Sequence, residues 1–292
     1  MENKLSNFVT NGLIRDVSFL NTSFPDGSHL KSIAYCVNAL FIPNILINKN
    51  IIGVITSSKL KKKFEEVKGL AISENPSKTF FNIHNKIYHS VNNNKKPIIG
   101  DNVFIHPSAI IEDDVIIGNN VHIGAYSIIK SQTIIKNDVF VDSNVVIGCT
   151  GHFYKFFDNK LFNVYHAGGV LVQDGAQLLT GCRVAKSVFN DHTVIGQNSV
   201  ISINVNIGHS TFISDNVIIA GSSQVSGFCQ IGKNVWIGPG VTVSDSIIIG
   251  ENARIEIGSI VIDNISENSR VSGPFATDHL KNLKNYIKIK RN

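Results

Sequence analysis

The chain has 292 residues, 43% of them hydrophobic, and a formal net charge of +5. This length accommodates one large or two modest domains, and no apolar run is long enough to span a bilayer. The basic residues cluster at residues 59–64 (KLKKKF) and 281–292 (KNLKNYIKIKRN) without a recognisable nucleic-acid-binding module. The charge therefore fits a small anionic partner better than a nucleic acid.

The cysteines and the first residues bear on the cellular compartment. Cys36, Cys149, Cys182 and Cys229 are widely scattered, without the CxxC spacing of zinc or redox sites. The opening MENKLSNFV lacks the charged start and hydrophobic core of a secretory signal. We therefore expect a cytoplasmic protein with reduced thiols.

Residues 1–97 are predicted to form a small α/β domain. ALFIP (residues 39–43) and IIGVIT (residues 51–56) are typical of short buried strands. NPSKTFFNIHNKIY (residues 75–88) is typical of a helix with a proline near its start. The polar, proline-ended SVNNNKKP (residues 90–97) is typical of a linker.

A six-residue period dominates residues 98–276. Aliphatic residues recur at every sixth position, and a small or β-branched residue follows most of them four positions later. The register slips near Val184 and then holds from Ile195 to Ile255. The first run comprises Ile105, Ile111, Ile117, Ile123, Ile129, Ile135, Val141 and Ile147. A helical period of 3.6 does not fit a strict six, whereas the hexapeptide form of the parallel β-helix does.

In such a fold each hexad supplies one short strand, so three hexads, about 18 residues, close one triangular coil. Successive coils lie roughly 4.8 Å apart, and the aliphatic anchors stack into a continuous interior. A single coil cannot bury its own apolar face, so stability requires stacking. The sequence predicts a mainly β protein with about seven coils.

Two segments depart from the period. CTGHFYKFFDNKLFNVYHAGG (residues 149–169) interrupts it, and insertions between coils protrude as loops that often carry binding groups. After the last coil, residues 277–292 are predicted to form a short basic helix that begins at Thr277 or Asp278.

Three stretches resemble one enzyme family. They are DVSFLNTSF (residues 16–24) with the strands and helix that follow it, the VIG and GGV that flank the insertion, and VIGQNSVISINVNIGHS (residues 194–210). Together they are similar to UDP-3-O-acylglucosamine N-acyltransferase and related enzymes acting on nucleotide-linked amino sugars. The resemblance implies a left-handed coil, a homotrimer and a uridine-binding N-terminal domain. It also implies acyl transfer from a thioester, acyl-CoA or acyl carrier protein, to a sugar amine, with no other cofactor.

His209 is the candidate catalytic base. It follows Gly208 at a position where neighbouring hexads carry Gln197, Ser202 or Ser214, so a bulky imidazole stands out. An amine that attacks a thioester must lose a proton, and histidine titrates near neutral pH. The resemblance implies the same role. The alternative is a solvent-facing histidine on a polar corner with no catalytic duty.

Asp191 is the candidate partner of that imidazole, because it precedes His209 by one nominal coil. Stacked corners would bring its carboxylate to a ring nitrogen. The alternative is an ordinary acidic corner residue.

Four further residues are candidates for substrate binding. The resemblance implies that Phe19 stacks on uracil and that Asn21 contacts the ribose or a phosphate, although Phe19 is equally compatible with a core position. His152 and His166 bracket the insertion and are candidates for lining the acceptor site. No metal site is expected, since no closely spaced histidine pair near His209 suggests the zinc site of a γ-carbonic anhydrase.

The chain also departs from the family pattern. Ser202 stands where relatives have an aspartate, Ser246 where they have a second histidine, and the C-terminal tail is short. We therefore expect a short-chain acyl-CoA donor and a role in bacterial surface-glycan biosynthesis. The alternatives are the carrier-protein-dependent enzyme of the lipid A pathway and a non-catalytic relative that binds a nucleotide sugar.

Overall fold

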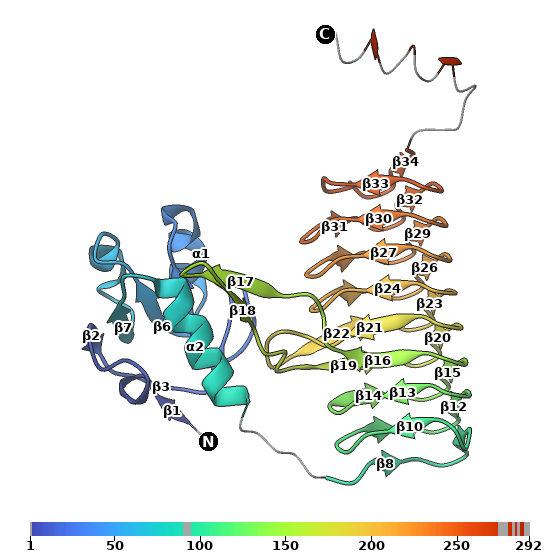
Figure 1. Cartoon of the computed structure of the whole chain (residues 1–292), viewed down its shortest axis with the longest axis horizontal. Helices are drawn as coiled ribbons and strands as arrows, with labels where there is room; N and C mark the ends of the chain where they lie inside the picture. The colour runs from blue at the N-terminus through green and yellow to red at the C-terminus, as the bar shows by residue number, and fades with distance from the viewer. Residues whose placement is uncertain (1, 90–94, 274–279, 282–283, 285–286, 289–292) are drawn as a thin grey trace.

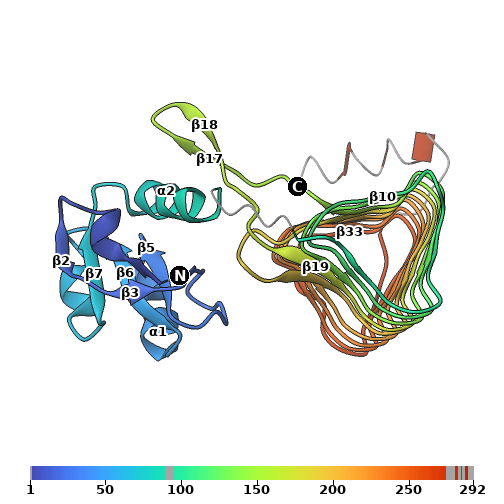
Figure 2. The ribbon, with the colours of Figure 1, turned by 90° about the horizontal axis from the view of Figure 1, so that it is seen from below.

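The computed structural model describes residues 2–89, 95–273, 280–281, 284 and 287–288. It contains a small α/β domain, built from the N-terminal residues, beside a tall stack of parallel β coils (Figure 1). Viewed along the stack, the coils superpose into a triangle (Figure 2). No helix in the described part of the chain is long and apolar enough to cross a membrane.

The N-terminal domain is a five-stranded sheet covered by one long helix. Its strand order is β2-β7-β6-β5-β4, with β2 antiparallel to β7 and the other pairs parallel. The helix α2 (Pro76–Tyr88) packs across β5 and β6. The sheet strands are β2 (Leu13–Arg15), β4 (Asn21–Thr22), β5 (Ser32–Cys36), β6 (Ile51–Thr56) and β7 (Gly69–Ile72), and a separate antiparallel pair is formed by β1 (Asn3–Lys4) and β3 (Ser18–Phe19).

The structure confirms two of the elements expected in this domain and corrects a third. IIGVIT is strand β6, and α2 begins at Pro76, where the side chain of Asn75 caps it by accepting the backbone N–H of Lys78. ALFIP is not a strand. It forms a 3₁₀ turn (Ala39–Phe41) that leads into the helix α1 (Ile42–Ile47), because Asn38 caps the turn and the proline lies in the first turn of α1. Two further 3₁₀ turns lie at Leu5–Asn7 and Lys61–Phe64.

The coil consists of three sheets of short parallel strands, one on each side of the triangle. The first sheet contains β8 (Ile98–Ile99), β11 (Ile116–Ile117), β14 (Thr133–Ile135), β19 (Gly169–Val172), β22 (His192–Ile195), β25 (Phe212–Ile213), β28 (Gln230–Ile231) and β31 (Ile248–Ile249). The second contains β10 (Ile110–Ile111), β13 (Ile128–Ile129), β16 (Val146–Cys149), β21 (Arg183–Ala185), β24 (Asn206–Ile207), β27 (Gln224–Val225), β30 (Thr242–Val243) and β33 (Ile260–Val261). The third contains β9 (Phe104–Ile105), β12 (His122–Ile123), β15 (Phe140–Val141), β20 (Gln177–Leu178), β23 (Val200–Ile201), β26 (Ile218–Ile219), β29 (Trp236–Ile237), β32 (Arg254–Ile255) and β34 (Arg270–Val271).

The hexad anchors form the interior of the coil, as expected. Ile117, Ile147, Ile207 and Ile237 are all at most 2% exposed and belong to one continuous apolar core. The corners between strands hold residues with left-handed backbone, mostly asparagine, aspartate and serine. Asparagine and aspartate are among the non-glycine residues that adopt this conformation most often. At one corner the side-chain amides of Asn216, Asn234 and Asn252 hydrogen-bond in a vertical row, at 3.3 and 3.0 Å.

Two interruptions alter the coil spacing in the middle of the stack. Ile147 pairs with Val184, 37 residues later, because residues 149–169 leave the coil as the predicted insertion. Val184 then pairs with Ile207, a separation of 23 rather than 18, so five extra residues lie between β21 and β22. Above Ile207 the spacing returns to 18 until the last coil, where Arg254 pairs with Arg270 at a spacing of 16.

The insertion joins the two parts of the molecule. Its antiparallel hairpin, β17 (Tyr154–Phe157) and β18 (Lys160–Asn163), lies beside α2 in both views (Figures 1 and 2). From α2, Asn85 Nδ2 donates to the Asn163 carbonyl at 2.8 Å, and His84 Nε2 lies 2.8 Å from the Tyr165 carbonyl oxygen. The insertion therefore holds the N-terminal domain against the middle of the coil.

At the C-terminal end, Leu280, Lys281, Lys284, Ile287 and Lys288 are helical. The rest of the predicted basic helix, and most of the predicted linker at residues 90–97, lie outside the described residues.

Candidate functional site

His209 lies at the coil corner after β24, where the insertion and the N-terminal domain meet the stack. Its ring fits between two glycines. A Cβ added at Gly227, one coil above, would lie 2.3 Å from His209 Cε1, and a Cβ added at Gly151 would lie 2.8 Å from Cδ2. Both glycines are therefore needed for the close approach of the backbone to the imidazole.

One hydrogen bond orients the imidazole. His209 Nε2 lies 3.3 Å from the carbonyl oxygen of His152, at the start of the insertion. A carbonyl oxygen can only accept, so in the neutral ring this bond places the proton on Nε2 and leaves the lone pair on Nδ1. Nδ1 is buried and has no hydrogen-bond partner among the described residues.

The surroundings of His209 favour its neutral form. The side chain is 6% exposed, and burial lowers its pKa below the usual 6.5, while the His152 carbonyl and, among nearby charges, Asp245 oppose the shift. The imidazole is therefore mostly unprotonated at neutral pH and free to accept a proton.

Two phenylalanines form the apolar wall beside this ring. Phe153 and Phe228 stand edge-on to the imidazole, with ring centroids 5.2 and 4.9 Å away. Phe228 has a left-handed backbone with a φ of 58°, an uncommon conformation for a bulky residue, and such strain is often found at functional sites. A cavity of about 340 Å³ opens here, lined by both phenylalanines, His209, His152 and Asp245, together with Gly208, Ser226 and Gly227.

The expected contact between Asp191 and His209 is not formed. The Asp191 carboxylate accepts a hydrogen bond from Ser187 Oγ and lies 3.4 Å from His29 Nε2. The reason is the longer spacing below His209, since the five extra residues displace Asp191 from the corner that a strict 18-residue repeat would give it. The regular spacing above His209 instead brings Asp245 into the same cavity.

The two insertion histidines lie close to His209 in different ways. His152 is exposed, lines the cavity and supplies the carbonyl that orients His209. His166 is 2% exposed, with its ring centroid 5.4 Å from that of His209. Burial, helped by the neighbouring His209, lowers its pKa to about 4, so it is neutral at physiological pH.

Phe19 and Asn21 occupy structural positions. Phe19 is fully buried in the core of the N-terminal domain, so neither face of its ring is available to a nucleobase. Asn21 Nδ2 donates to the Leu30 carbonyl, and its Oδ1 accepts from Tyr88 and from Asn190 of the coil. The expectation of a stacking Phe19 is therefore wrong for this structure, and Asn21 ties the domain to the coil.

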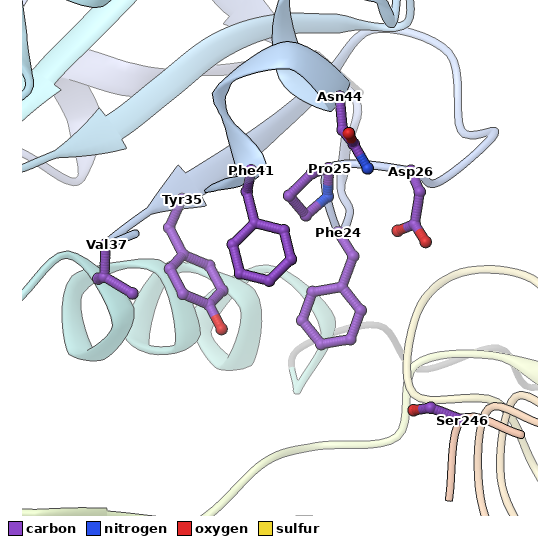
Figure 3. A pocket seen from close by; sticks show the side chains of 8 residues that line it. All are labelled: Phe24, Pro25, Asp26, Tyr35, Val37, Phe41, Asn44 and Ser246. Carbon is purple, nitrogen blue, oxygen red and sulfur yellow. The ribbon is translucent and has the colours of Figure 1, made fainter. Parts of the chain in front are cut away.

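A different set of aromatic residues faces open space in this domain. A pocket of about 310 Å³ is lined by the rings of Phe24, Tyr35 and Phe41, with Ser246 of the coil on its far side (Figure 3). Its remaining lining residues are Pro25, Asp26, Val37 and Asn44. Aromatic walls with a few polar groups suit a planar heterocycle.

The aromatic pocket and the His209 cavity adjoin one another. Phe24 lies 5.3 Å from Phe228, between ring centroids, and Ser246 is the chain neighbour of Asp245. The two pockets therefore lie next to each other at the junction of the N-terminal domain and the coil.

Several of these residues escaped prediction from the sequence. Counting 18 residues upward from His209 leads to Gly227 and then Asp245, whereas counting downward crosses the irregular spacing. For Tyr35 and Phe41 no comparable signal was available. Phe41 lies in the turn that replaces the expected ALFIP strand, and Tyr35 lines the pocket from β5.

Comparisons with known proteins agree with this architecture. The bacterial transferase hexapeptide (six repeats) family matches residues 96–131 and 228–263. The chain is 34% identical over 131 residues to UDP-3-O-acylglucosamine N-acyltransferase of Campylobacter lari, an alignment that covers 44% of this chain and 40% of that protein. The chain thus aligns with less than half the length of this curated relative.

Two solved structures have a similar fold. UDP-N-acetylglucosamine acyltransferase from Campylobacter jejuni matches with a TM-score of 0.53 and 21% identity, over 66% of this chain and 79% of that one. The enzyme of the same description from Bacteroides fragilis matches with a TM-score of 0.51 and 18% identity, over 67% and 75%. At these identities the likeness concerns the fold. The chain thus folds as a left-handed parallel β-helix, and residues 96–131 and 228–263 match the hexapeptide repeats of bacterial transferases.

Proposed function

We propose that the protein is an N-acyltransferase that moves an acyl group from a thioester to the amino group of a nucleotide-linked amino sugar. The observation that carries this proposal is His209, a buried neutral imidazole that lines a cavity adjoining an aromatic pocket. The partial match to UDP-3-O-acylglucosamine N-acyltransferase supports the same class of reaction.

The nucleotide base occupies the aromatic pocket. Stacking on rings such as Tyr35 and Phe41 provides an orientation-dependent contact that any planar base can use. The sugar then extends past Phe24 and Ser246 toward the His209 cavity. This replaces the nucleotide site that the resemblance implied at Phe19 and Asn21.

His209 supplies the proton transfer. As the sugar amine attacks the thioester carbonyl, its nitrogen becomes positively charged and must lose a proton. The imidazole of His209 accepts that proton and passes it to the departing thiolate. Gly151, Gly227 and the His152 carbonyl hold the ring in one orientation, which removes part of the entropic cost of the step.

The active assembly is a homotrimer. Outward-facing residues of the first sheet form a mainly apolar column, interrupted by Gln230, that includes Ile98, Ile116, Phe212 and Ile248, which are 63, 41, 50 and 47% exposed. Such a column on a flat face is suited to contact with another copy of the chain. Closed rotational symmetry then limits the assembly to a fixed number of chains.

The proposed donor is a short-chain acyl-CoA, and the proposed role is in bacterial surface-glycan biosynthesis. The competing donor is an acyl carrier protein, as in the lipid A pathway. Both share the thioester chemistry at His209 and differ in what must dock on the protein.

The test is a screen of acceptors and donors. UDP- and dTDP-linked amino sugars are incubated with acetyl-CoA, longer acyl-CoAs and acyl carrier protein thioesters, and free thiol and the mass of the sugar product are recorded. We expect acylated product with at least one pair and a higher kcat/KM for the CoA thioester. A protein that binds a nucleotide sugar in calorimetry without acylating it with any donor would be the non-catalytic relative instead.

A further inference from the structure

At one corner of the coil, a histidine, a glycine and an aspartate lie above one another in successive coils. His209, Gly227 and Asp245 follow at intervals of 18 residues, in the region where Ile207 pairs with Val225 and Val225 with Val243. Because Gly227 has no side chain, no side chain at this corner of the intervening coil stands between the imidazole and the carboxylate. Both side chains line the same cavity.

The Asp245 carboxylate is available to a ligand. It is exposed, and it accepts a long hydrogen bond, 3.4 Å, from Ser246 Oγ. Among the described residues, no Lys, Arg or His nitrogen lies within ion-pair distance of it. The carboxylate therefore brings a negative charge to the cavity wall without a cation bound to it.

The charged groups around the cavity leave this position open for a cation. Lys155 of the insertion has its Nζ 4.5 Å from the centre of the Phe153 ring, and burial lowers its pKa while Asp245 opposes that shift. His209 is neutral, and its Nδ1 is buried without a partner. A positively charged group that entered the cavity would meet the Asp245 carboxylate, with the imidazole of His209 in the wall of the same cavity.

We propose that Asp245 selects an amino group over a hydroxyl group in the acceptor, by holding the acceptor's ammonium beside His209. The proposal rests on the proposed function, since it identifies which group of the nucleotide sugar the cavity recognises. A carboxylate binds an ammonium through a charge-assisted hydrogen bond, whereas a hydroxyl at the same place offers no charge.

The proton balance follows from this arrangement. The ammonium first releases one proton to solvent, and the resulting amine attacks the thioester carbonyl carbon. The new C–N bond forms, the nitrogen gives a second proton to His209, and the C–S bond breaks. His209 returns that proton to the sulfur, so the products are the amide, the free thiol and one proton in solution. Asp245 keeps its charge throughout and acts in binding.

The experiment compares two ligands and three variants. The ligands are the amino sugar nucleotide accepted as substrate and its counterpart with a hydroxyl in place of the amine, used as a competitive inhibitor. The variants are Asp245→Asn, which keeps the shape and removes the charge, Asp245→Glu, and the control Asp263→Asn, which alters an exposed carboxylate elsewhere on the coil.

We expect Asp245→Asn to raise KM for the amine about 10-fold, the effect of losing one charged hydrogen bond, with kcat within about threefold of wild type. The Ki of the hydroxyl analogue stays unchanged, Asp245→Glu recovers part of the loss, and Asp263→Asn behaves like wild type. Equal rises in KM and Ki would overturn the proposal, as would a fall in kcat alone, which would mean that Asp245 acts through His209.

Calorimetry separates this proposal from the proposed function. If no donor supports turnover, the acylation proposal fails, yet tighter binding of the amine than of the hydroxyl analogue, lost in Asp245→Asn, would still support the role of Asp245. Equal binding of the two ligands, or binding of neither, overturns it.

Discussion

In the β-helix, each strand has two to four residues and contacts mainly the strands of the coils directly above and below it. The N-terminal domain, in contrast, buries its core between a twisted sheet and a helix. The coil places side chains above one another at a fixed spacing, but its outer faces are flat and enclose nothing. The domain supplies a concave aromatic pocket. The candidate site lies where the two meet, which suggests that chemistry and binding are divided between them.

The strongest test of this division is the removal of the base from the coil. We expect His209→Ala to lower kcat by roughly 10²–10⁴, because a general base contributes about that much, while KM for the nucleotide sugar changes little. In wild type, the acidic limb of the pH–rate profile should lie below pH 6.5, since burial lowers the pKa of His209. Activity within a few-fold of wild type would remove His209 from the mechanism.

The junction between the two regions should be sensitive to acid. His84 of α2 is fully buried between Thr22 and the Tyr165 carbonyl, and burial lowers its pKa from 6.5 to about 4. The unfolded chain takes up a proton at higher pH than the folded one, so stability is lost as the pH falls from about 6.5 to about 4. The loss amounts to about 3 kcal/mol.

Denaturant unfolding at pH 7 and pH 4 measures this effect. His84→Gln should be less stable at pH 7 but should lose less on acidification, with His166 responsible for part of the dependence that remains. His89→Gln, at the exposed end of the same helix, serves as the control. An unchanged pH dependence in His84→Gln would show that the junction is not the acid-sensitive element.

A methyl group added at Gly227 tests whether the close approach of the backbone fixes the position of His209. Gly227→Ala puts a Cβ 2.3 Å from His209 Cε1, and the ring is confined by Gly151, Phe153 and Phe228. We expect kcat to fall about 10²-fold, as for a displacement of about 1 Å. Gly221→Ala is the matched control, because its Cβ would meet one carbonyl oxygen at 3.3 Å. Similar kinetics for the two variants would contradict the positioning role of Gly227.

The smallest expected effect belongs to the N-terminal domain. Phe41→Ala removes a half-exposed ring from the aromatic pocket, so we expect KM for the nucleotide sugar to rise roughly fivefold, the equivalent of about 1 kcal/mol of stacking, at constant kcat. Leu40→Ala, which changes a more exposed neighbour that does not line the pocket, should leave KM unchanged. A fall in kcat in Phe41→Ala would show that binding and chemistry are not divided in this way.

Most of the fold could be read from the sequence because the coil is periodic. The anchors from Ile117 to Ile255, the insertion and the location of β6 and α2 all follow from local patterns. His209 could be selected as well, since an imidazole among small polar corner residues is a local anomaly.

The remainder of the site depended on long-range geometry. Asp191 was misplaced because five extra residues changed the spacing below His209, and nothing local reveals how such a segment bulges. Phe19 and Tyr35 are both aromatic residues in or next to short strands, and only the packing of the domain leaves the first buried and the second facing the pocket.

The regular spacing of the coil also restricts how its gene can change length. Adding or deleting 18 codons above Asp245 adds or removes one whole coil. This keeps every corner in register, including the amide row at Asn234 and Asn252. The last coil is two residues shorter, yet Arg254 pairs with Arg270 and the amide row continues from Asn252 to Asn268. Extra residues, in contrast, must leave the stack. The segment between β21 and β22, with its five extra residues, is such a case, and its Val188 and Phe189 are buried against the N-terminal domain. A coil of this kind therefore lengthens most easily by whole coils, and other insertions need another part of the protein to cover them.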